Sequence, residues 1–420
     1  MTTVPPRPLP RPPALDRVHD SASIRVQHRR LLLGLLWSQA EGSRAELARS
    51  TGLSRSTVSA IVSELLDTGL VHETRAGAST GGRRPIILAF RDDAAQLIGV
   101  DLGASHVSVA RSDLRLRIAG QRFARHDVRD DPWGALALVE RLVRELLEEV
   151  GGVNSLIGIG VAAPSPIDPR RPGRLSHSVV PRWRGIDLVE VLGAAFGRPV
   201  FVDNDANAGA LAELWWGAGR SGGDLAFVKV ATGVGAGLVL GGELFRGTAG
   251  IAGEIGHLTV DPQGPECLCG LRGCLVTFVG RAALIETVRK RRDAFRSSPL
   301  HVDPITLEGI VRAALDGDPL GQEIIEEAGR ILGVGVASLL NVLNPGRVVL
   351  SGELVEAGEL LLSPLRQTVR SRALAESIAH VDIDRSTLGP KGVVMGAATL
   401  VLQAALAEPA LIPQMRRAQE

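Results

Sequence analysis

All three cysteines of the chain lie within eight residues of one another, and a histidine precedes them. The run reads Cys267-Leu268-Cys269-Gly270-Leu271-Arg272-Gly273-Cys274, and His257 stands ten residues before Cys267. Three thiolates and one imidazole make a closed four-ligand set for structural zinc, with no position left for water. The glycines let the backbone fold tightly enough for the thiolates to converge. The spacing therefore predicts a zinc site at His257, Cys267, Cys269 and Cys274, and the alternative is three buried free thiols beside an unrelated histidine.

Two glycine-containing turns and one polar segment follow expected strands and could bind phosphate, metal or hydroxyl groups. The segment Thr232-Gly233-Val234-Gly235-Ala236-Gly237 could cradle phosphate with its backbone N–H groups. Asp101, which precedes Gly103, could hold Mg²⁺ through water. The segment Asp203-Asn204-Asp205 ends a strand before a helix, where a carboxylate can serve as general base toward a hydroxyl. Helix N-capping is the alternative role for Asp203 and Asp205.

A small N-terminal module carries residues that could contact DNA. Residues 24–40 and 44–51 are expected helices, and Ser54 is a good N-cap for a third helix. Val58, Ile61, Val62, Leu65 and Leu66 form one apolar stripe along that third helix. Residues 71–73 and 86–90 are expected strands joined by a loop that ends in Gly81-Gly82-Arg83-Arg84-Pro85. This order is typical of a helix-turn-helix followed by a wing.

The free face of the third helix would enter a major groove. There Ser56 and Thr57 can hydrogen-bond base edges or phosphates, and Arg55 can reach a phosphate or a guanine. Arg83 and Arg84 on the wing tip suit phosphate contact or a narrow minor groove. The alternative is a three-helix module used for protein contact, with a solvated polar face.

From Leu97 onward the pattern predicts an α/β fold. Apolar strand candidates alternate with helical stretches, and two glycine turns could mark two similar halves. The strand candidates are 97–100, 156–161, 200–202, 225–230 and 347–350, and the helical stretches are 133–150, 205–216 and 319–343.

Composition excludes several classes of protein. The 420 residues are 45% hydrophobic and 22% charged, which is ordinary for a globular chain and not for a disordered, collagen-like or coiled-coil one. The longest uninterrupted apolar runs, such as 31–37, are far shorter than the ~20 residues of a membrane span. The Pro-rich start has no apolar core, so we expect no secretory signal and a cytoplasmic location. Three cysteines cannot form a disulfide framework.

Charge is unevenly distributed. Residues 1–90 hold twelve Arg, no Lys and seven Asp or Glu, a net +5, so the remainder carries about −4 of the overall +1. A basic front end on an acidic body favours nucleic-acid contact at the N-terminus only.

Taken together, these motifs resemble the ROK family of repressors and sugar kinases, in its repressor branch with an N-terminal winged helix. The resemblance covers about residues 24–405. Its most specific segment is Ala252-Gly253-Glu254-Ile255-Gly256-His257-Leu258 with the cysteine run, and 202–213 and 341–352 follow. Pro181-Arg182-Trp183, with Leu188, resembles a loop near the sugar pocket of the family.

The resemblance implies a two-lobed, actin-like sugar kinase fold (ribonuclease H-like) behind the winged helix. It implies that Asn204, Asp205, Glu254 and His257 contact a sugar, with Asp205 as catalytic base in active kinases. One ring nitrogen of His257 would bind zinc and the other the sugar. The ATP site would hold Asp101, Gly103, Thr232, Gly233 and Gly235.

Three departures from the family pattern bear on activity. Kinases usually read Asp-x-Gly-Gly-Thr, whereas this chain has Ala104-Ser105 in the last two places. Glu353 stands where kinases carry a glycine turn near the nucleotide, and Val276 stands where the family commonly has a glutamate that contacts sugar. The first two changes weigh against Mg-ATP binding, and the third affects sugar affinity or specificity.

Three functions remain open from the sequence. The first is a sugar-responsive transcriptional repressor of carbohydrate-utilisation genes that binds a double-stranded operator as a homodimer or homotetramer. The second is an ATP-dependent sugar kinase with a fused DNA-binding domain. The third is a regulator whose degenerate cleft responds to a phosphosugar, to a partner or to nothing.

The expected organisation has three parts. Residues 1–22 form a disordered tail, 23–92 the winged helix-turn-helix domain and 93–420 the kinase-like domain. Within the last part, about 93–203 with 390–412 form the small lobe and about 204–389 the large lobe.

Overall fold

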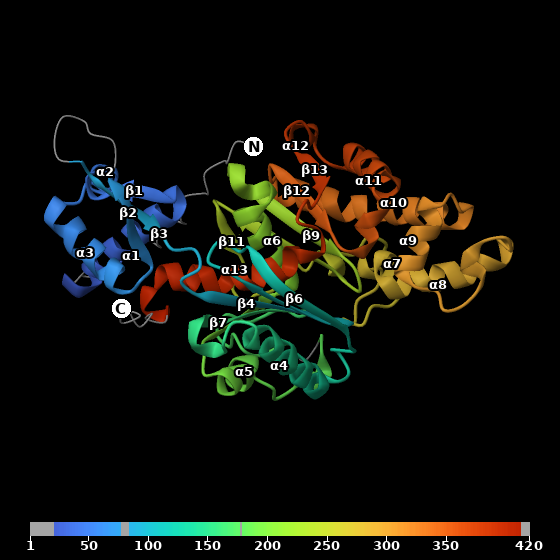
Figure 1. Ribbon diagram of the computed structural model, residues 1–420. Helices are drawn as coiled ribbons and strands as arrows, with labels where there is room; N and C mark the ends of the chain where they lie inside the picture. The colour runs from blue at the N-terminus through green and yellow to red at the C-terminus, as the bar shows by residue number, and fades with distance from the viewer. Residues whose placement is uncertain (1–20, 77–83, 177–178, 413–420) are drawn as a thin grey trace.

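The computed structural model describes residues 21–76, 84–176 and 179–412. It contains an N-terminal winged helix and two five-stranded sheets with helices packed against them (Figure 1). The predicted class, a winged helix-turn-helix followed by a two-lobed α/β body, is confirmed.

The winged helix begins with α1 (Ser21–Gln39), α2 (Arg44–Thr51) and α3 (Arg55–Asp67). Ser43 caps α2 in a reciprocal capping box with Glu46, and Ser54 caps α3 as predicted. Strands β2 (Val71–Ala76) and β3 (Ile86–Phe90) form the antiparallel wing. A short strand β1 (Glu41–Ser43), which periodicity did not reveal, pairs with β3 and gives the order β1-β3-β2. The apolar stripe of α3 is buried as expected, apart from the partly buried Leu66.

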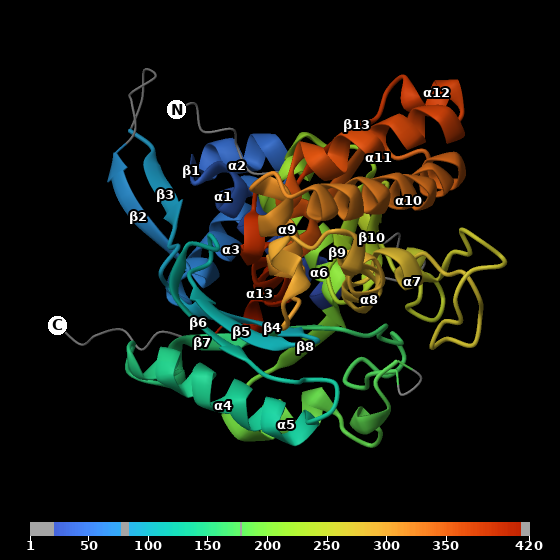
Figure 2. The same cartoon turned by 90° about the vertical axis from the view of Figure 1, so that its right-hand side faces the viewer.

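The small lobe is built on a sheet with the order β6-β5-β4-β7-β8. Helices α4 (Pro132–Glu148) and α5 (Leu188–Phe196) cover one face, and α13 (Gly392–Ala407) covers the other (Figure 2). The close approach of α13 requires glycine, since a Cβ on Gly99 would meet Val394 O at 2.2 Å. The strands are β4 (Gln96–Gly103), β5 (His106–Ser112), β6 (Ile118–Arg125), β7 (Leu156–Ala163) and β8 (Val200–Asn204).

The large lobe repeats the same strand order as β11-β10-β9-β12-β13. The suggestion of two similar halves is therefore borne out at the level of topology. Its strands are β9 (Leu225–Val230), β10 (Val234–Leu240), β11 (Glu243–Phe245), β12 (Arg347–Ser351) and β13 (Asp382–Arg385). Its helices are α7 (Val276–Val279), α8 (Arg281–Arg291), α9 (Leu307–Leu315), α10 (Pro319–Leu343), α11 (Glu359–Arg372) and α12 (Ala375–Ile378).

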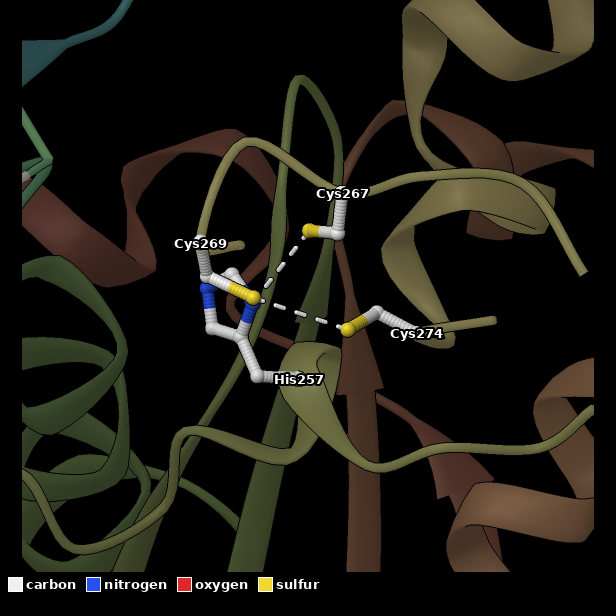
Figure 3. Close-up of side chains that lie close together, drawn as sticks. All are labelled: His257, Cys267, Cys269 and Cys274. Atoms are coloured by element: carbon white, nitrogen blue, oxygen red, sulfur yellow. Dashed lines mark hydrogen bonds between the residues drawn. The ribbon is translucent and has the colours of Figure 1, made fainter. Parts of the chain in front are cut away.

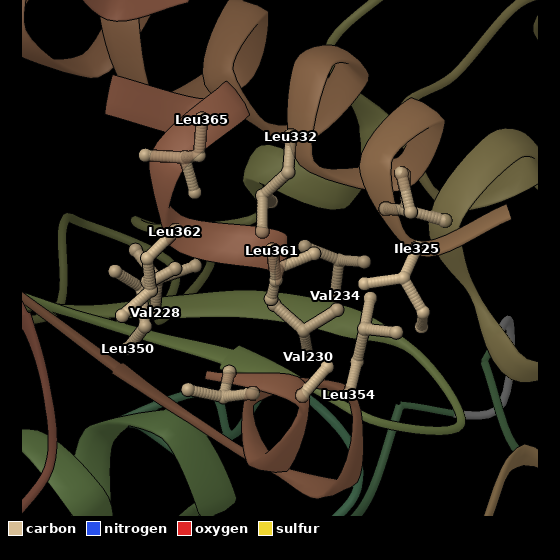
Figure 4. Packing of buried hydrophobic residues seen from close by; sticks show 14 of the residues in the cluster. Val228, Val230, Val234, Ile325, Leu332, Leu350, Leu354, Leu361, Leu362 and Leu365 are labelled. Atoms are coloured by element: carbon tan, nitrogen blue, oxygen red, sulfur yellow. The ribbon is translucent and has the colours of Figure 1, made fainter. Parts of the chain in front are cut away.

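The large-lobe core lies between its sheet and the long helices. Side chains of β9, β10 and β12 meet those of α10 and α11 (Figure 4). Among them are Val228, Val230, Val234, Leu350, Ile325, Leu332, Leu361 and Leu365. Alternating strand residues and the apolar face of a 25-residue helix thus hold the second sheet in place.

Helix α6 (Asp205–Trp216) lies between the two lobes and packs on β9, β10 and α13. Small residues allow this, since a Cβ on Gly237 would meet Ala206 O at 2.3 Å and one on Gly396 would meet Ala208 O at 1.7 Å. The span Gly389–Ala407, which includes α13, is long and apolar enough to cross a membrane, but it is 67% buried. That burial between α6 and the small-lobe sheet identifies a core helix.

One sequence expectation needs correction. The segment Thr232–Gly237 is not a loop: β10 begins at Val234 and pairs antiparallel with β9, so only Thr232 and Gly233 lie in a hairpin turn. The turn after Asp101 is the equivalent hairpin between β4 and β5 in the small lobe. Neither glycine segment leads from a strand into a helix, so neither offers a helix N-terminus to a phosphate.

Candidate functional sites

Asn204 and Asp205 stand where β8 ends and α6 begins. Asn204 is the N-cap, and its Oδ1 accepts hydrogen bonds from the backbone N–H groups of Ala206 (2.8 Å) and Asn207 (3.2 Å). The alternative in which Asp203 or Asp205 caps this helix is therefore wrong. Because the side-chain oxygen Oδ1 of Asn204 caps the helix, the side-chain NH₂ group of the same residue remains to donate to a ligand.

Asp203 has a positioning role instead. Its buried carboxylate accepts from Asn207 Nδ2 at 2.9 Å and from Arg246 Nε at 2.8 Å. Arg246 follows β11, and its carbonyl accepts from the N–H of Ala252. Asp203 thus ties the start of α6 to the segment that leads to Glu254.

Glu254 and His257 reach the same place from a short 3-10 turn, Ile255–His257. Two glycines allow this turn to approach β10 closely. A Cβ on Gly253 would meet Ala236 O at 1.9 Å, and one on Gly256 would meet Val234 O at 2.2 Å. Glu254 Oε2 lies 4.0 Å from His257 Nε2. Burial, together with the nearby Asp205 carboxylate, raises the pKa of Glu254 to about 7. The structure thus gathers at one place the residues expected to contact sugar.

The three cysteines and His257 converge as predicted (Figure 3). Their ligand atoms all lie within 4.8 Å of one another, with Cys267 Sγ 3.6 Å from His257 Nδ1 and Cys269 Sγ 3.7 Å from Cys274 Sγ. Gly273 makes the turn possible, because its φ is +64° and a Cβ there would meet Asp261 O at 1.5 Å. Three sulfurs and one imidazole nitrogen in this arrangement fit a tetrahedral zinc ion. His257 Nδ1 faces the sulfurs, which leaves Nε2 facing Glu254.

The residues expected to bind nucleotide lie at or beside the two hairpin turns. One of them, Asp101, already has a protein partner, His106. His106 Nε2 lies 3.2 Å from Asp101 Oδ2, and the imidazole of His106 fills the space beside Gly103. A pocket of about 540 Å³ opens between the turns. Its lining residues are Ala104, Ser105, Arg125, His126, Asp127, Arg129, Asp130 and Thr232. Gly235 lies within β10.

Two basic residues at these turns were not found by sequence reasoning. Lys229 Nζ lies 2.8 Å from Asp205 Oδ2, and both side chains are mostly buried. Arg281, the first residue of α8, donates to Ser105 Oγ at 3.0 Å and to Glu353 Oε2 at 2.7 Å. A signal for Lys229 existed, because it is one of only three lysines and lies three residues before Thr232 of the second glycine turn.

Two other sequence landmarks lie in cores. Trp183 is buried in the small lobe, and its Nε1 donates to Val128 O at 2.7 Å. Val276 begins α7 and packs against the large-lobe core, and its hydrocarbon side chain cannot accept a hydrogen bond from a sugar hydroxyl.

The candidate DNA interface is the exposed face of α3 with the wing. Arg55 and Ser56 are exposed, and Thr57 is partly exposed. The hydroxyl of Ser54 bonds those of Ser56 (2.9 Å) and Thr57 (2.8 Å), which orders this end of the helix. Arg84 is exposed just before β3, at the loop end of the wing, and Arg83 lies outside the described residues.

Comparisons with known proteins assign both parts. Residues 97–404 match the model of the family described as the ROK family, and residues 27–72 match winged helix-turn-helix DNA-binding domains. The xylose repressor of Caldicellulosiruptor bescii is 32% identical over 87% of this chain and 93% of its own length. NagC, a DNA-binding transcriptional dual regulator of Escherichia coli, is 32% identical over 87% of this chain and 89% of its own.

Solved structures give the same picture. A ROK family transcriptional regulator, described as a homologue of the E. coli MLC protein, superposes with a TM-score of 0.78 at 27% identity. That match covers 92% of this chain and 97% of the other. A ROK family glucokinase from Streptomyces griseus, in complex with glucose and AMPPNP, gives a TM-score of 0.66 at 30% identity. It covers 73% of this chain and 99% of the glucokinase.

Proposed function

Because the chain belongs to the ROK family and carries the winged helix of the repressor branch, it is a sugar-responsive transcriptional repressor, and we propose that its affinity for DNA is controlled by a free sugar bound at Asn204, Asp205, Glu254 and His257. Two carboxylates, an amide and an imidazole are the donors and acceptors that sugar hydroxyls require. Asp205 then accepts a hydroxyl hydrogen bond, and catalysis is not needed.

The observation that carries this proposal is the path of α6. The helix starts at Asp205 in the sugar cleft and ends at Trp215 and Trp216, which contact Trp37 of α1. The distance between ring centroids is 5.5 Å for Trp37 and Trp215 and 6.0 Å for Trp37 and Trp216. At 1.5 Å per residue, twelve residues span about 18 Å. One rigid element therefore joins the sugar site to the DNA-binding domain.

The DNA-binding domain packs against α6 and α13. Its core forms one continuous apolar cluster with α6 and α13, including Leu36, Leu65, Leu214 and Leu402. The indole of Trp37 also donates to Leu114 O at 3.0 Å, and the Arg115 guanidinium lies over its ring. A shift of α6 on sugar binding would thus move α1 and with it α3. The sugar would act by favouring one of two arrangements that differ in operator affinity.

We assign zinc to the cluster of His257, Cys267, Cys269 and Cys274. The ion would be structural, since four protein ligands leave no open position. It would fix the imidazole of His257, so that Nε2 is held toward Glu254 and the sugar. Burial lowers the pKa of His257, which keeps its imidazole neutral and able to ligate.

On the DNA side, Arg55, Ser56, Thr57, Arg83 and Arg84 would make the contacts. Two winged helices in a homodimer or homotetramer would read a pseudo-palindromic operator. We place this regulator in the cytoplasm, with no membrane partner. We propose control of carbohydrate-utilisation genes, because relatives are named for xylose and N-acetylglucosamine.

A sugar kinase is the second candidate, because Asp205 and both turns are assembled and a glucokinase with glucose and AMPPNP has the same fold. A coupled ATP-turnover assay over a hexose panel tests it, with Asp205→Ala as the required inactive control. Turnover that the control abolishes would establish the kinase.

The repressor proposal is tested by selecting sheared genomic DNA on the immobilised protein. Bound fragments are then eluted with xylose, N-acetylglucosamine, glucose and their phosphates. Discrete fragments released by one free sugar are the expected result. Fragments that only a sugar phosphate or no sugar releases would favour the degenerate cleft, and no enrichment at all would refute operator binding.

A further inference from the structure

The Mg-ATP site implied by the fold does not fit this chain, and the misfit has a specific cause. Lys229 lies on β9 of the large lobe, and Asp101 lies on β4, which has the same central position in the small-lobe sheet. The ammonium group of Lys229 is bonded to Asp205 at 2.8 Å and also interacts with the charge of Asp101. A fixed cation is thus bonded to one of the two carboxylates on which a magnesium-dependent kinase would rely, and its charge acts on the other.

We propose that Lys229 is a built-in counter-ion that takes the place of the divalent metal beside Asp205 and Asp101, so that the cleft holds its sugar without nucleotide or divalent metal. This inference rests on the proposed sugar site. Lys229 and Asp205 are only 15% and 18% exposed at their side chains, and Asp101 is 7% exposed. Removing Lys229 would leave two mostly buried carboxylates without their shared counter-ion.

The protonation states agree with this arrangement. Burial works against the charged form of Lys229, but the Asp205 and Asp101 carboxylates outweigh it and hold the pKa of Lys229 above its usual value. Burial likewise works against the charged form of Asp101, but Lys229 and the bond with His106 hold its pKa below the usual value. Both groups therefore remain ionised at neutral pH.

A second bridge joins the two lobes at the hairpin turn between β4 and β5, which holds Ser105. Arg281 of the large lobe binds Ser105, the hydroxyl of the small-lobe turn, and at the same time pairs with Glu353. The hydroxyl that would face a phosphate is thus occupied by a protein cation whose charge Glu353 already balances.

The neighbouring pocket does not attract a triphosphate either. Its lining includes Arg125 and Arg129 but also Asp127 and Asp130, so the formal charges cancel, with His126 beside them. Arg125 also forms an ion pair with Glu308 of α9, with Nη2 of the arginine 3.8 Å from Oε2 of the glutamate. The cleft therefore has internal ion pairs where a kinase would need free positive charge.

The test measures thermal unfolding of the full-length protein in about 10 mM MgCl₂ and in magnesium-free buffer. The variants are Lys229→Met, which keeps the length of the side chain without its charge, and the double variant Lys229→Met/Asp205→Asn. Lys290→Met is the matched control, since that lysine is 72% exposed on α8. We expect magnesium to raise the midpoint of Lys229→Met by several degrees and to leave the wild type, Lys290→Met and the double variant unchanged.

The outcomes separate this inference from the proposed function. A wild type that responds to MgCl₂ or Mg-ATP as strongly as Lys229→Met would overturn the inference, and so would a Lys229→Met that does not respond. If Lys229→Met fails to fold but the double variant folds, charge compensation is supported. If neither folds, the role of counter-ion is refuted. The magnesium response needs no sugar, whereas failure of xylose, N-acetylglucosamine and glucose to shift the wild-type midpoint would count against the proposed sugar site alone.

Discussion

Replacing Trp215 by leucine should uncouple the sugar site from the DNA-binding domain without unfolding either. Trp215 is buried at the end of α6 and makes two aromatic contacts, with Trp37 at 5.5 Å and with Trp216 at 6.1 Å. Each such pair contributes about 0.5–1.5 kcal/mol beyond burial, so the substitution removes about 1–3 kcal/mol. That range matches a typical coupling free energy, which corresponds to an effect of about 5–150-fold on affinity. Most of the sugar effect on operator binding should therefore disappear.

The assay is fluorescence anisotropy of a labelled operator fragment obtained by the genomic selection, titrated with and without the eluting sugar. Trp133→Leu is the matched control, because Trp133 is 63% exposed on α4 and far along the chain from α6. Affinity for DNA without sugar should stay close to that of the wild type, since Trp37 keeps its contact with Trp216 and its hydrogen bond to Leu114. If Trp215→Leu keeps the full sugar effect, or if Trp133→Leu loses it equally, α6 is not the connecting element.

Further substitutions test the remaining assignments. Arg55→Ala should weaken operator binding and lower the salt dependence by about one counter-ion, as seen in titrations at several salt concentrations. Cys267→Ser should lower the zinc content measured by elemental analysis below one per chain and reduce the unfolding midpoint, whereas unchanged zinc would contradict the ligand set. Gly256→Ala should abolish the sugar-induced midpoint shift but spare DNA binding, because its Cβ would meet a backbone oxygen at 2.2 Å. Gly233→Ala, with open space around it, should change neither, and a loss there would favour a nucleotide site.

Local signals were enough for much of the molecule. The cap at Ser54, the stripe of α3 and the bounds of α6 and α10 depend on residues three or four apart, so periodicity and capping chemistry predict them. The metal cluster is also nearly local, because three of its four ligands fall within eight residues. The repeated strand order was suggested by the two glycine turns, one at each hairpin.

The character of those turns was not predictable, because a glycine run after a strand can lead into a helix or into a second strand. Pairing decided it: β10 finds its partner in β9, so the expected phosphate loop became a hairpin. Likewise, a carboxylate before a helix can cap it or bind elsewhere. Asn204 took the cap, and its neighbours Asp203 and Asp205 became free to pair with Arg246 and Lys229.

The sequence by itself determined which domains and which groups of polar residues this protein contains: a winged helix, two α/β halves, a thiol cluster and a set of polar residues suited to sugar. Only the tertiary structure decided which charges meet. Lys229 reaches Asp205 from another element, Arg281 reaches Ser105 across 176 residues, and Trp37 of the DNA-binding domain meets the far end of the helix that begins in the cleft. The physical reason is that periodicity shows which face of an element is buried, whereas the partner that covers it depends on the order of strands and the packing of helices between sheets.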